Sequence, residues 1–354
     1  MAKGIPPQKN PLSKKKKWAY SLVATLLVLT LIESIAWWLE RREYMGGFSL
    51  QGSAHETLYI DKGDDRPHLR PGAKLSGARY NIEINQHGFR GPELQRRQSN
   101  TVRVWFIGGS TTFDIYASSN ETTWPALTGA ALQEAWPDKK IEIINAGVPG
   151  ETIRGNRQDF QNYYGRITPD ILVIHAGPND LRSSSIHARG LASEPPPGPL
   201  HRLATFRLLS RKFQLQRIPQ SWHNREIDHP LWERIETDIR HFIAAAEQKG
   251  VKVVLATHAH RAKTKSTGRS AAIQVAEGTR LLRMDAVSVI KTFKQYNDMI
   301  RGIATEQGLP VIDLRDKIPA SSKYFGDHTH FSARGSRLAA KSAVEVLQKI
   351  VIEP

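Results

Sequence analysis

The sequence predicts an α/β protein in three layers, with a five-stranded parallel sheet covered by helices on both faces and one transmembrane helix before it. Short apolar runs alternate with longer helical patterns between residues 101 and 350, as in chains that form parallel sheets with helices on both faces. A 22-residue run, Trp18 to Leu39, carries Glu33 as its only charge. The chain has 354 residues and no cysteine, which excludes disulfides and thiolate metal sites.

The order of elements supports this fold class. Buried strands are expected wherever a short β-branched or aromatic run is bounded by turn residues, and helices wherever a longer 3.6-residue periodicity follows. The expected strands are 102–107, 141–144, 171–174, 251–256 and 310–314, and the expected helices are 123–136, 231–249, 287–307 and 333–350.

The N-terminal segment predicts a membrane anchor. About 20 apolar residues cross a bilayer, and the lysines at 14–17 favour a cytoplasmic N-terminus with the main domain outside. Glu33 lies within two turns of the outer end and could extend toward the headgroups. A cleaved signal peptide is the alternative, because Ser34-Ile35-Ala36 is a small-x-small triplet, although the bulky Trp37 and Trp38 follow it.

Three residues from opposite ends of the predicted domain are the parts of a nucleophilic site. Ser110 follows the first strand in Gly108-Gly109-Ser110-Thr111, and Asp327 and His330 lie near the C-terminus. A serine hydroxyl needs a base to accept its proton and an acid to orient that base. With a spacing of three residues, Asp327 can bind Nδ1 of His330 while Nε2 faces Ser110.

Two further turns are placed to stabilise the negative charge that develops on a carbonyl oxygen. Gly147 follows the second strand and Asn179 follows the third. Their backbone and side-chain N–H groups, with the backbone N–H of Ser110, predict an oxyanion hole. Each motif alone has another interpretation: a phosphate-binding turn at Ser110, a turn glycine at 147, and an Asx-turn or helix cap at Asn179 and Asp180.

Serine, glycine, asparagine and histidine in this order resemble the marker blocks of the SGNH hydrolases, the GDSL-type esterases and lipases. The first block reads Gly-Gly-Ser-Thr here. The resemblance implies a flavodoxin-like fold, Ser110 as nucleophile with Asp327 and His330, and an oxyanion hole of Ser110, Gly147 and Asn179. It implies no cofactor and no metal, although His258 and His260 have the spacing of a ligand pair. Thr112 stands where an α/β-hydrolase elbow needs glycine.

The expected organisation has four parts. A basic cytoplasmic tail at 1–17 precedes the anchor at 18–39, a membrane-proximal connector at 40–98, and the SGNH hydrolase domain at 99–354 with insertions at 182–230 and 257–285. The connector contains Gly88-Phe89-Arg90-Gly91, which is expected to pack on the catalytic domain. The insertions leave from carboxyl ends of strands and are candidate lids or recognition walls.

The formal net charge of +16 is concentrated in three places. Residues 1–17 hold six basic and no acidic residues. Residues 182–230 hold eight basic and three acidic residues, and residues 251–285 hold seven basic and two acidic residues. Such loops favour an anionic polymer or lipid headgroups, and no nucleic-acid motif accompanies them.

The sequence thus predicts an ester hydrolase on the periplasmic or extracellular side of the cytoplasmic membrane, removing acyl (acetyl) groups from an envelope or extracellular polysaccharide. A lipid-directed esterase or lysophospholipase, an acyltransferase with the same triad, and a non-catalytic glycan-binding or assembly module remain alternatives.

Overall fold

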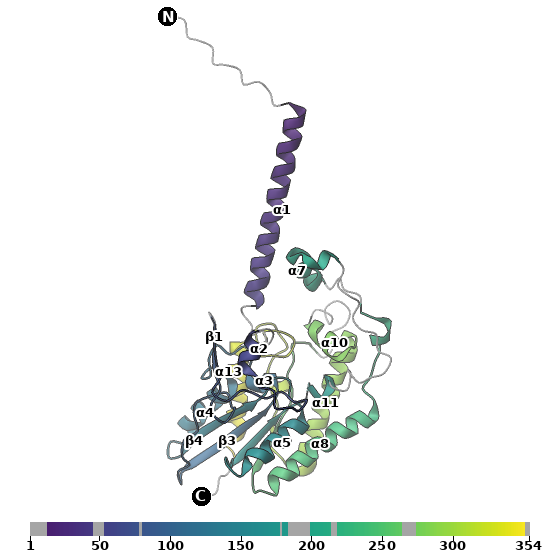
Figure 1. The fold of residues 1–354 in the computed structure, drawn as a ribbon. Helices are drawn as coiled ribbons and strands as arrows, with labels where there is room; N and C mark the ends of the chain where they lie inside the picture. Colours follow the sequence, from purple (N-terminus) through teal and green to yellow (C-terminus); the bar gives the residue numbers. More distant parts are fainter. Residues whose placement is uncertain are drawn as a thin grey trace, which may run out of the picture.

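The computed structural model describes residues 13–44, 53–77, 80–177, 179–182, 199–213, 218–263 and 274–350 (Figure 1). Much of the predicted basic tail (1–12) and parts of both insertions (183–198, 214–217 and 264–273) lie outside the described residues, as does Pro178.

The five-stranded parallel sheet is confirmed. Its strands are β3 (Thr101–Gly108), β4 (Lys140–Gly147), β5 (Ile171–His175), β6 (Lys252–Ala256) and β7 (Val311–Ile312), in the order β4-β3-β5-β6-β7. All eight residues of β3, which lies between β4 and β5, are buried. A strand covered on both faces has no solvent side, which explains why this segment is an apolar run rather than an alternating pattern.

Helices cover both faces of the sheet. Trp105 and Ile107 of β3 point to the face covered by α5 (Ile153–Tyr164), α8 (His229–Glu247) and α11 (Ala286–Gln307). Val104 and Phe106 point to the other face, covered by α4 (Trp124–Ala135) and α13 (Ala333–Leu347). Because successive strand residues alternate in direction, one strand anchors both halves of the core.

The connector forms elements of its own. It contains α2 (Ser53–Leu58) and an antiparallel pair, β1 (Lys74–Gly77) with β2 (Tyr80–Glu83). Leu58 and Ile82 are fully buried in one cluster with Phe113 and Val148 of the catalytic domain. The connector therefore packs directly on the segments that flank the candidate nucleophile.

The N-terminal helix α1 (Lys14–Tyr44) stands away from the catalytic domain, and α7 (Ala204–Phe213) lies beside it (Figure 1). The stretch Lys14–Leu39 is long and apolar enough to cross a membrane, a property that a signal sequence shares. The remaining short elements are α3 (Ser110–Phe113), η1 (Pro199–Arg202), η2 (Gln220–Trp222), α10 (Ala276–Leu282) and α12 (Leu314–Lys317).

Candidate active site

Ser110 is held beyond the end of β3 by a close contact between backbones. Gly108 pairs with Gly147 on one side and with His175 on the other. A Cβ at position 108 would lie 1.9 Å from the carbonyl oxygen of His175, so only glycine fits. The chain then turns into α3, whose first residue is Ser110. The carboxyl ends of three parallel strands therefore meet around this hydroxyl.

His330 and Asp327 approach Ser110 from the turn before α13. The Oγ of Ser110 lies 2.6 Å from Nε2 of His330, and Nδ1 of His330 lies 2.6 Å from Oδ2 of Asp327. Oδ1 of the same carboxylate accepts the backbone N–H groups of Thr329 and His330, and Tyr116 donates its hydroxyl to Oδ2. Burial opposes ionisation of Asp327, but His330 and these donors hold its pKa well below its usual range. An ionised Asp327 then fixes the ring of His330.

A cavity of about 320 Å³ opens over Ser110 and His330. This volume falls near the lower end of the roughly 300–1,000 Å³ typical of small-molecule sites. Ile115 and Leu281, which belongs to α10, contribute apolar atoms to the wall of the cavity. Tyr59 of the connector and Arg182, the first residue of the first insertion, complete the wall. Both insertions thus border the site, as the sequence predicts.

Asn179 lines this cavity and is positioned by Glu151. Its Nδ2 donates to the backbone oxygen of Glu151 at 2.9 Å. A Cβ at Gly109 would lie only 2.7 Å from the same Nδ2, so the amide is close beside the nucleophile turn. The neighbouring Asp180 accepts the backbone N–H of Ile153 and caps α5. Burial raises the pKa of Asp180 to about 7.

The structure does not bring Gly147 into the cavity. Its N–H donates to Oδ1 of Asn145, and a Cβ there would lie 2.2 Å from the backbone nitrogen of Phe113. Gly147 is therefore a packing position between β4 and α3. Gly150, three residues later, lines the cavity with φ +94°. Gly150 is therefore the glycine of this turn that lines the cavity, whereas the sequence points to Gly147.

Buried histidines form the floor of the cavity. His175 stacks on His258, and His258 stacks on Phe293. Burial lowers the pKa of His175 to about 4 and also lowers the pKa values of His258 and His260, so these rings are neutral near pH 7. In the described part of the chain no three His, Asp or Glu side chains are grouped so as to hold a metal ion.

The tautomer of His175 follows from its contacts. The hydroxyl of Thr112 donates to the backbone oxygen of His175, so it accepts from Nδ1–H of the ring at 3.0 Å. Nε2 is then left as a bare acceptor. It is buried, it has no partner among the described residues, and its ring lines the cavity.

Arg90 of the connector holds the segment that follows the nucleophile. Its guanidinium donates to the backbone oxygens of Phe113 and Asp114 at 2.9 Å, and to those of Ala117 and Ser119. The side chain is buried, with Asn120 accepting from Nε. The expected packing of Gly88-Phe89-Arg90-Gly91 on the catalytic domain is observed, and Arg90 contacts backbone rather than the cavity.

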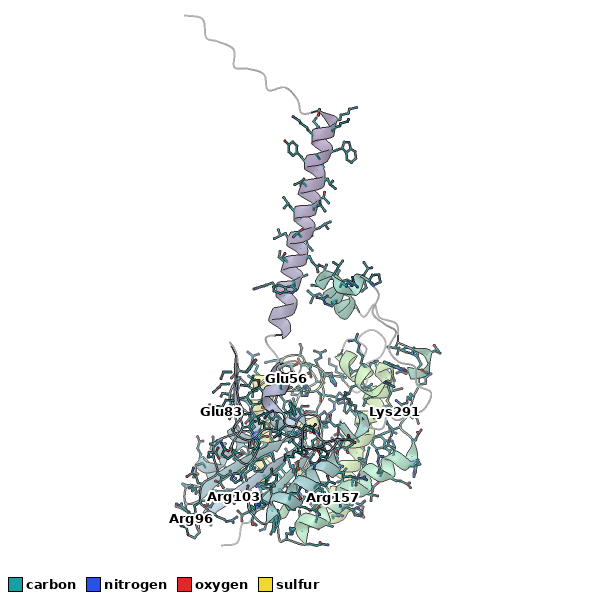
Figure 2. The ribbon with its side chains drawn as sticks, in the orientation of Figure 1. Glu56, Glu83, Arg96, Arg103, Arg157 and Lys291 are labelled. Atoms are coloured by element: carbon teal, nitrogen blue, oxygen red, sulfur yellow. The ribbon has the colours of Figure 1, made fainter. Side chains whose placement is uncertain are left out.

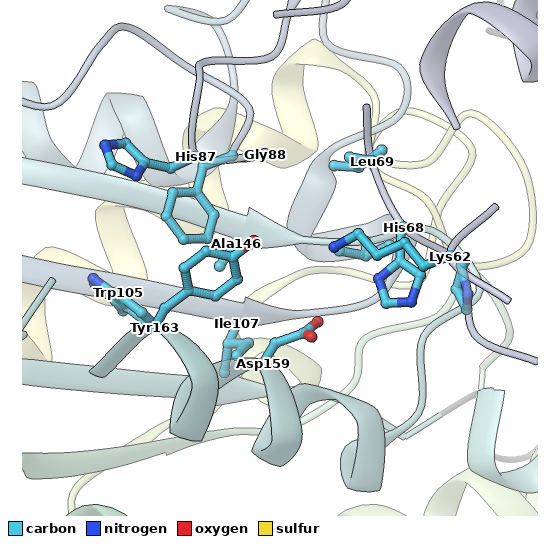
Figure 3. Close-up of a pocket in the computed structure, with 13 residues that line it drawn as sticks. Lys62, His68, Leu69, His87, Gly88, Trp105, Ile107, Ala146, Asp159 and Tyr163 are labelled. Atoms are coloured by element: carbon cyan, nitrogen blue, oxygen red, sulfur yellow. The ribbon is translucent and has the colours of Figure 1, made fainter. Parts of the chain in front are cut away.

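A second cavity, shown in Figure 3, lies between the connector and the sheet. It is lined by His68, His87, Trp105, Asp159 and Tyr163 among others. Its volume of about 30 Å³ has room for one or two waters. It holds neither Ser110 nor His330, so the larger cavity is the candidate active site.

A serine, histidine and aspartate joined by hydrogen bonds at the carboxyl edge of a parallel sheet define a serine hydrolase. Residues 106–338 match the GDSL-like lipase/acylhydrolase family, and the chain belongs to this family. The protein is therefore an ester-hydrolysing serine hydrolase.

Similar solved structures include two GDSL-family lipolytic proteins. The protein from Veillonella parvula is 14% identical, with 70% of this chain and 100% of that chain covered and a TM-score of 0.45. The protein from Desulfitobacterium hafniense is 18% identical, with coverages of 70% and 99% and a TM-score of 0.42. An acetylxylan esterase from Geobacillus stearothermophilus is 16% identical, with coverages of 69% and 93% and a TM-score of 0.40. No curated protein matches the chain.

Proposed function

We propose that this protein is a membrane-anchored esterase that removes short acyl groups, acetyl above all, from a polysaccharide of the cell envelope or the extracellular space. The observation that carries the proposal is the hydrogen-bonded chain Ser110–His330–Asp327 beside a small cavity of about 320 Å³. The apolar run 14–39 supports the anchor, with the catalytic domain on the outer side of the cytoplasmic membrane.

In the proposed mechanism Ser110 attacks the ester carbonyl while Nε2 of His330 accepts the hydroxyl proton. Asp327 stabilises the imidazolium that forms, and His330 then returns the proton to the leaving alcohol. Water, activated by His330, releases the acyl group from Ser110. Backbone N–H groups of Ser110 and Gly150 and the Nδ2 of Asn179 are the assigned donors to the oxyanion, with Gly150 in place of the predicted Gly147.

The volume of the cavity supports a short acyl group. At about 320 Å³ it lies near the lower end of the range for small-molecule sites, which leaves little room for a long acyl chain.

A lipid-directed esterase is the second candidate, and one observation favours it. The cavity takes residues from α3, α10 and the segment after α2, which lie at the end of the domain nearest α1 (Figure 1). A substrate held in the membrane would therefore approach the cavity from the end of the domain that lies nearest to α1.

A chain-length series with full-length protein in detergent tests the proposal. We expect kcat/KM for p-nitrophenyl esters to fall more than tenfold from acetate to octanoate, and acetate to be released from an acetylated acidic polysaccharide. Ser110→Ala should lower both activities by about a thousandfold or more and abolish labelling by a fluorophosphonate. A Ser110-dependent preference for octanoate or longer esters would favour the lipid-directed candidate instead. Full turnover by a folded Ser110→Ala protein would refute the assigned nucleophile.

A further inference from the structure

Glu33, the single acid in the apolar part of α1, caps a helix that lies 171 residues later in the chain. Its carboxylate accepts the backbone N–H of Ala204 at 2.5 Å, the backbone N–H of Thr205 at 3.1 Å and the hydroxyl of Thr205 at 2.7 Å. These groups begin α7, which lies beside α1 (Figures 1 and 2). The first turn of a helix has N–H groups with no acceptor in the helix, and Glu33 supplies one.

The contact fixes α7 at a defined level along α1. Glu33 precedes Leu39, the last residue of the apolar stretch, by six residues. At about 1.5 Å per residue this places Glu33 about 9 Å inside the end of the stretch. Amphipathic helices at a membrane surface bury their apolar face by roughly 5–10 Å. The start of α7 therefore lies at the depth expected for an interfacial helix.

The surface of residues 199–213 fits the same location. Outside α1, the exposed large apolar side chains of the described chain are Leu200, Leu203, Leu209 and Val287, and three of these four belong to this segment. The segment also carries Arg202, Arg207, Arg211 and Lys212 and no acidic residue. Exposed leucines alternating with basic residues are typical of helices that lie among anionic headgroups.

We propose that residues 199–213, here called the interfacial segment, lie in the outer headgroup region of the membrane that α1 spans. The leucines contact acyl chains, the basic residues contact anionic phospholipid headgroups, and Glu33 fastens the segment to α1. This inference rests on the proposed membrane anchor. The first insertion, to which the interfacial segment belongs, begins at Arg182 on the cavity wall.

The absence of native cysteine allows a direct test with single-cysteine variants of the full-length protein. Leu209→Cys reports on the interfacial segment, Leu26→Cys on α1, and Arg96→Cys on the end of the domain opposite to α1 (Figure 2). Each variant is labelled with an environment-sensitive fluorophore and placed in nanodiscs of phosphatidylcholine and phosphatidylglycerol. Brominated lipid should reduce emission at least twofold for labels at positions 26 and 209 and leave the label at position 96 unchanged. Nanodiscs without phosphatidylglycerol should weaken quenching at position 209 alone.

The outcomes separate this inference from the anchor itself. Quenching at position 26 without quenching at position 209 would overturn the interfacial segment and leave the anchor standing. No quenching at either position would overturn the anchor and the inference that rests on it. A label at position 209 that resists both brominated lipid and aqueous iodide would mean that protein, such as a second copy of the chain, covers this surface.

A second variant tests the role of Glu33. Glu33→Ala removes the acceptor of three hydrogen bonds and should at least halve the lipid quenching at position 209 without changing it at position 26. Ser34→Ala, which removes a hydroxyl bonded only within α1, is the matched control and should have no effect. Equal quenching in Glu33→Ala and wild type would show that Glu33 does not hold the segment.

Discussion

Asn179 carries an amide with two N–H groups, of which one donates to the backbone of Glu151. The contact orients the side chain and leaves the second N–H for the cavity that Asn179 lines. Glu151 is itself fixed by Arg66 of the connector at 2.8 Å. A donor held in place before the reaction is more effective than one that must reorient, because no reorganisation accompanies the developing charge.

Asn179→Ala should therefore lower kcat on p-nitrophenyl acetate by about a hundredfold while KM changes little, since the amide meets charge that exists only during attack. Steady-state kinetics of the purified variant measure both constants. Asn162→Ala, on the exposed side of α5, is the control and should match wild type. A change confined to KM would assign Asn179 to ground-state binding.

Gly147 and Gly150 show which part of the site could not be predicted from the sequence. Ser110, Asp327 and His330 were predictable because their residue types and their positions after strands point to one chemistry. Gly147 and Gly150 have the same residue type within one run, and only the tertiary structure distinguishes them. The backbone of Phe113 fills the space beside Gly147, whereas Gly150 lines the cavity.

At the scale of the elements, the structure of the connector was the hardest part to predict from the sequence. Strands β1 and β2 have four residues each, of which only Ile82 is buried, so they lack the alternation that predicts a strand. The core of the domain was predictable because β3, β5 and β6 are apolar runs between turn residues. The connector instead acts through Arg90, whose buried guanidinium donates to four backbone oxygens between Phe113, the last residue of α3, and Ser119.

Arg90→Lys should lower the free energy of unfolding by about 3 kcal/mol, because an ammonium cannot reach these acceptors and leaves buried oxygens without donors. Urea unfolding measures this loss. We also expect a reduced kcat for p-nitrophenyl acetate at temperatures where the variant is folded, since α3 carries Ser110. Arg96→Lys, exposed in the same connector, should change neither quantity. Wild-type kcat in a destabilised Arg90→Lys protein would limit Arg90 to a structural role.

For the molecule as a whole, the buried histidines below the site link folding to pH. The pKa of His175 falls from its ordinary 6.5 to about 4 because burial disfavours the charged ring. As pH falls, the unfolded chain takes up this proton before the folded protein does. The contribution of His175 to stability is thus complete above pH 6.5 and is lost between pH 6.5 and 4. Buried Asp180, with its raised pKa, acts in the opposite direction.

A comparison of wild type with His175→Gln isolates this contribution from the other buried groups. The difference in unfolding free energy between the two proteins should shrink by about 3 kcal/mol from pH 7 to pH 4, at about 1.4 kcal/mol for each pH unit. Chemical denaturation at several pH values provides the measurement. A difference that stays constant over this range would mean that His175 titrates normally in the folded protein.

The cap that Glu33 provides also sets an order of assembly. Its acceptor is made early in synthesis, whereas the N–H groups of Ala204 and Thr205 are made 171 residues later. In the proposed topology, α7 reaches its partner only after α1 has entered the bilayer. Cleavage after Ala36, the alternative that the sequence leaves open, would release a catalytic domain whose α7 has lost its cap. A shed form would thus differ from the anchored enzyme in the first insertion as well as in location.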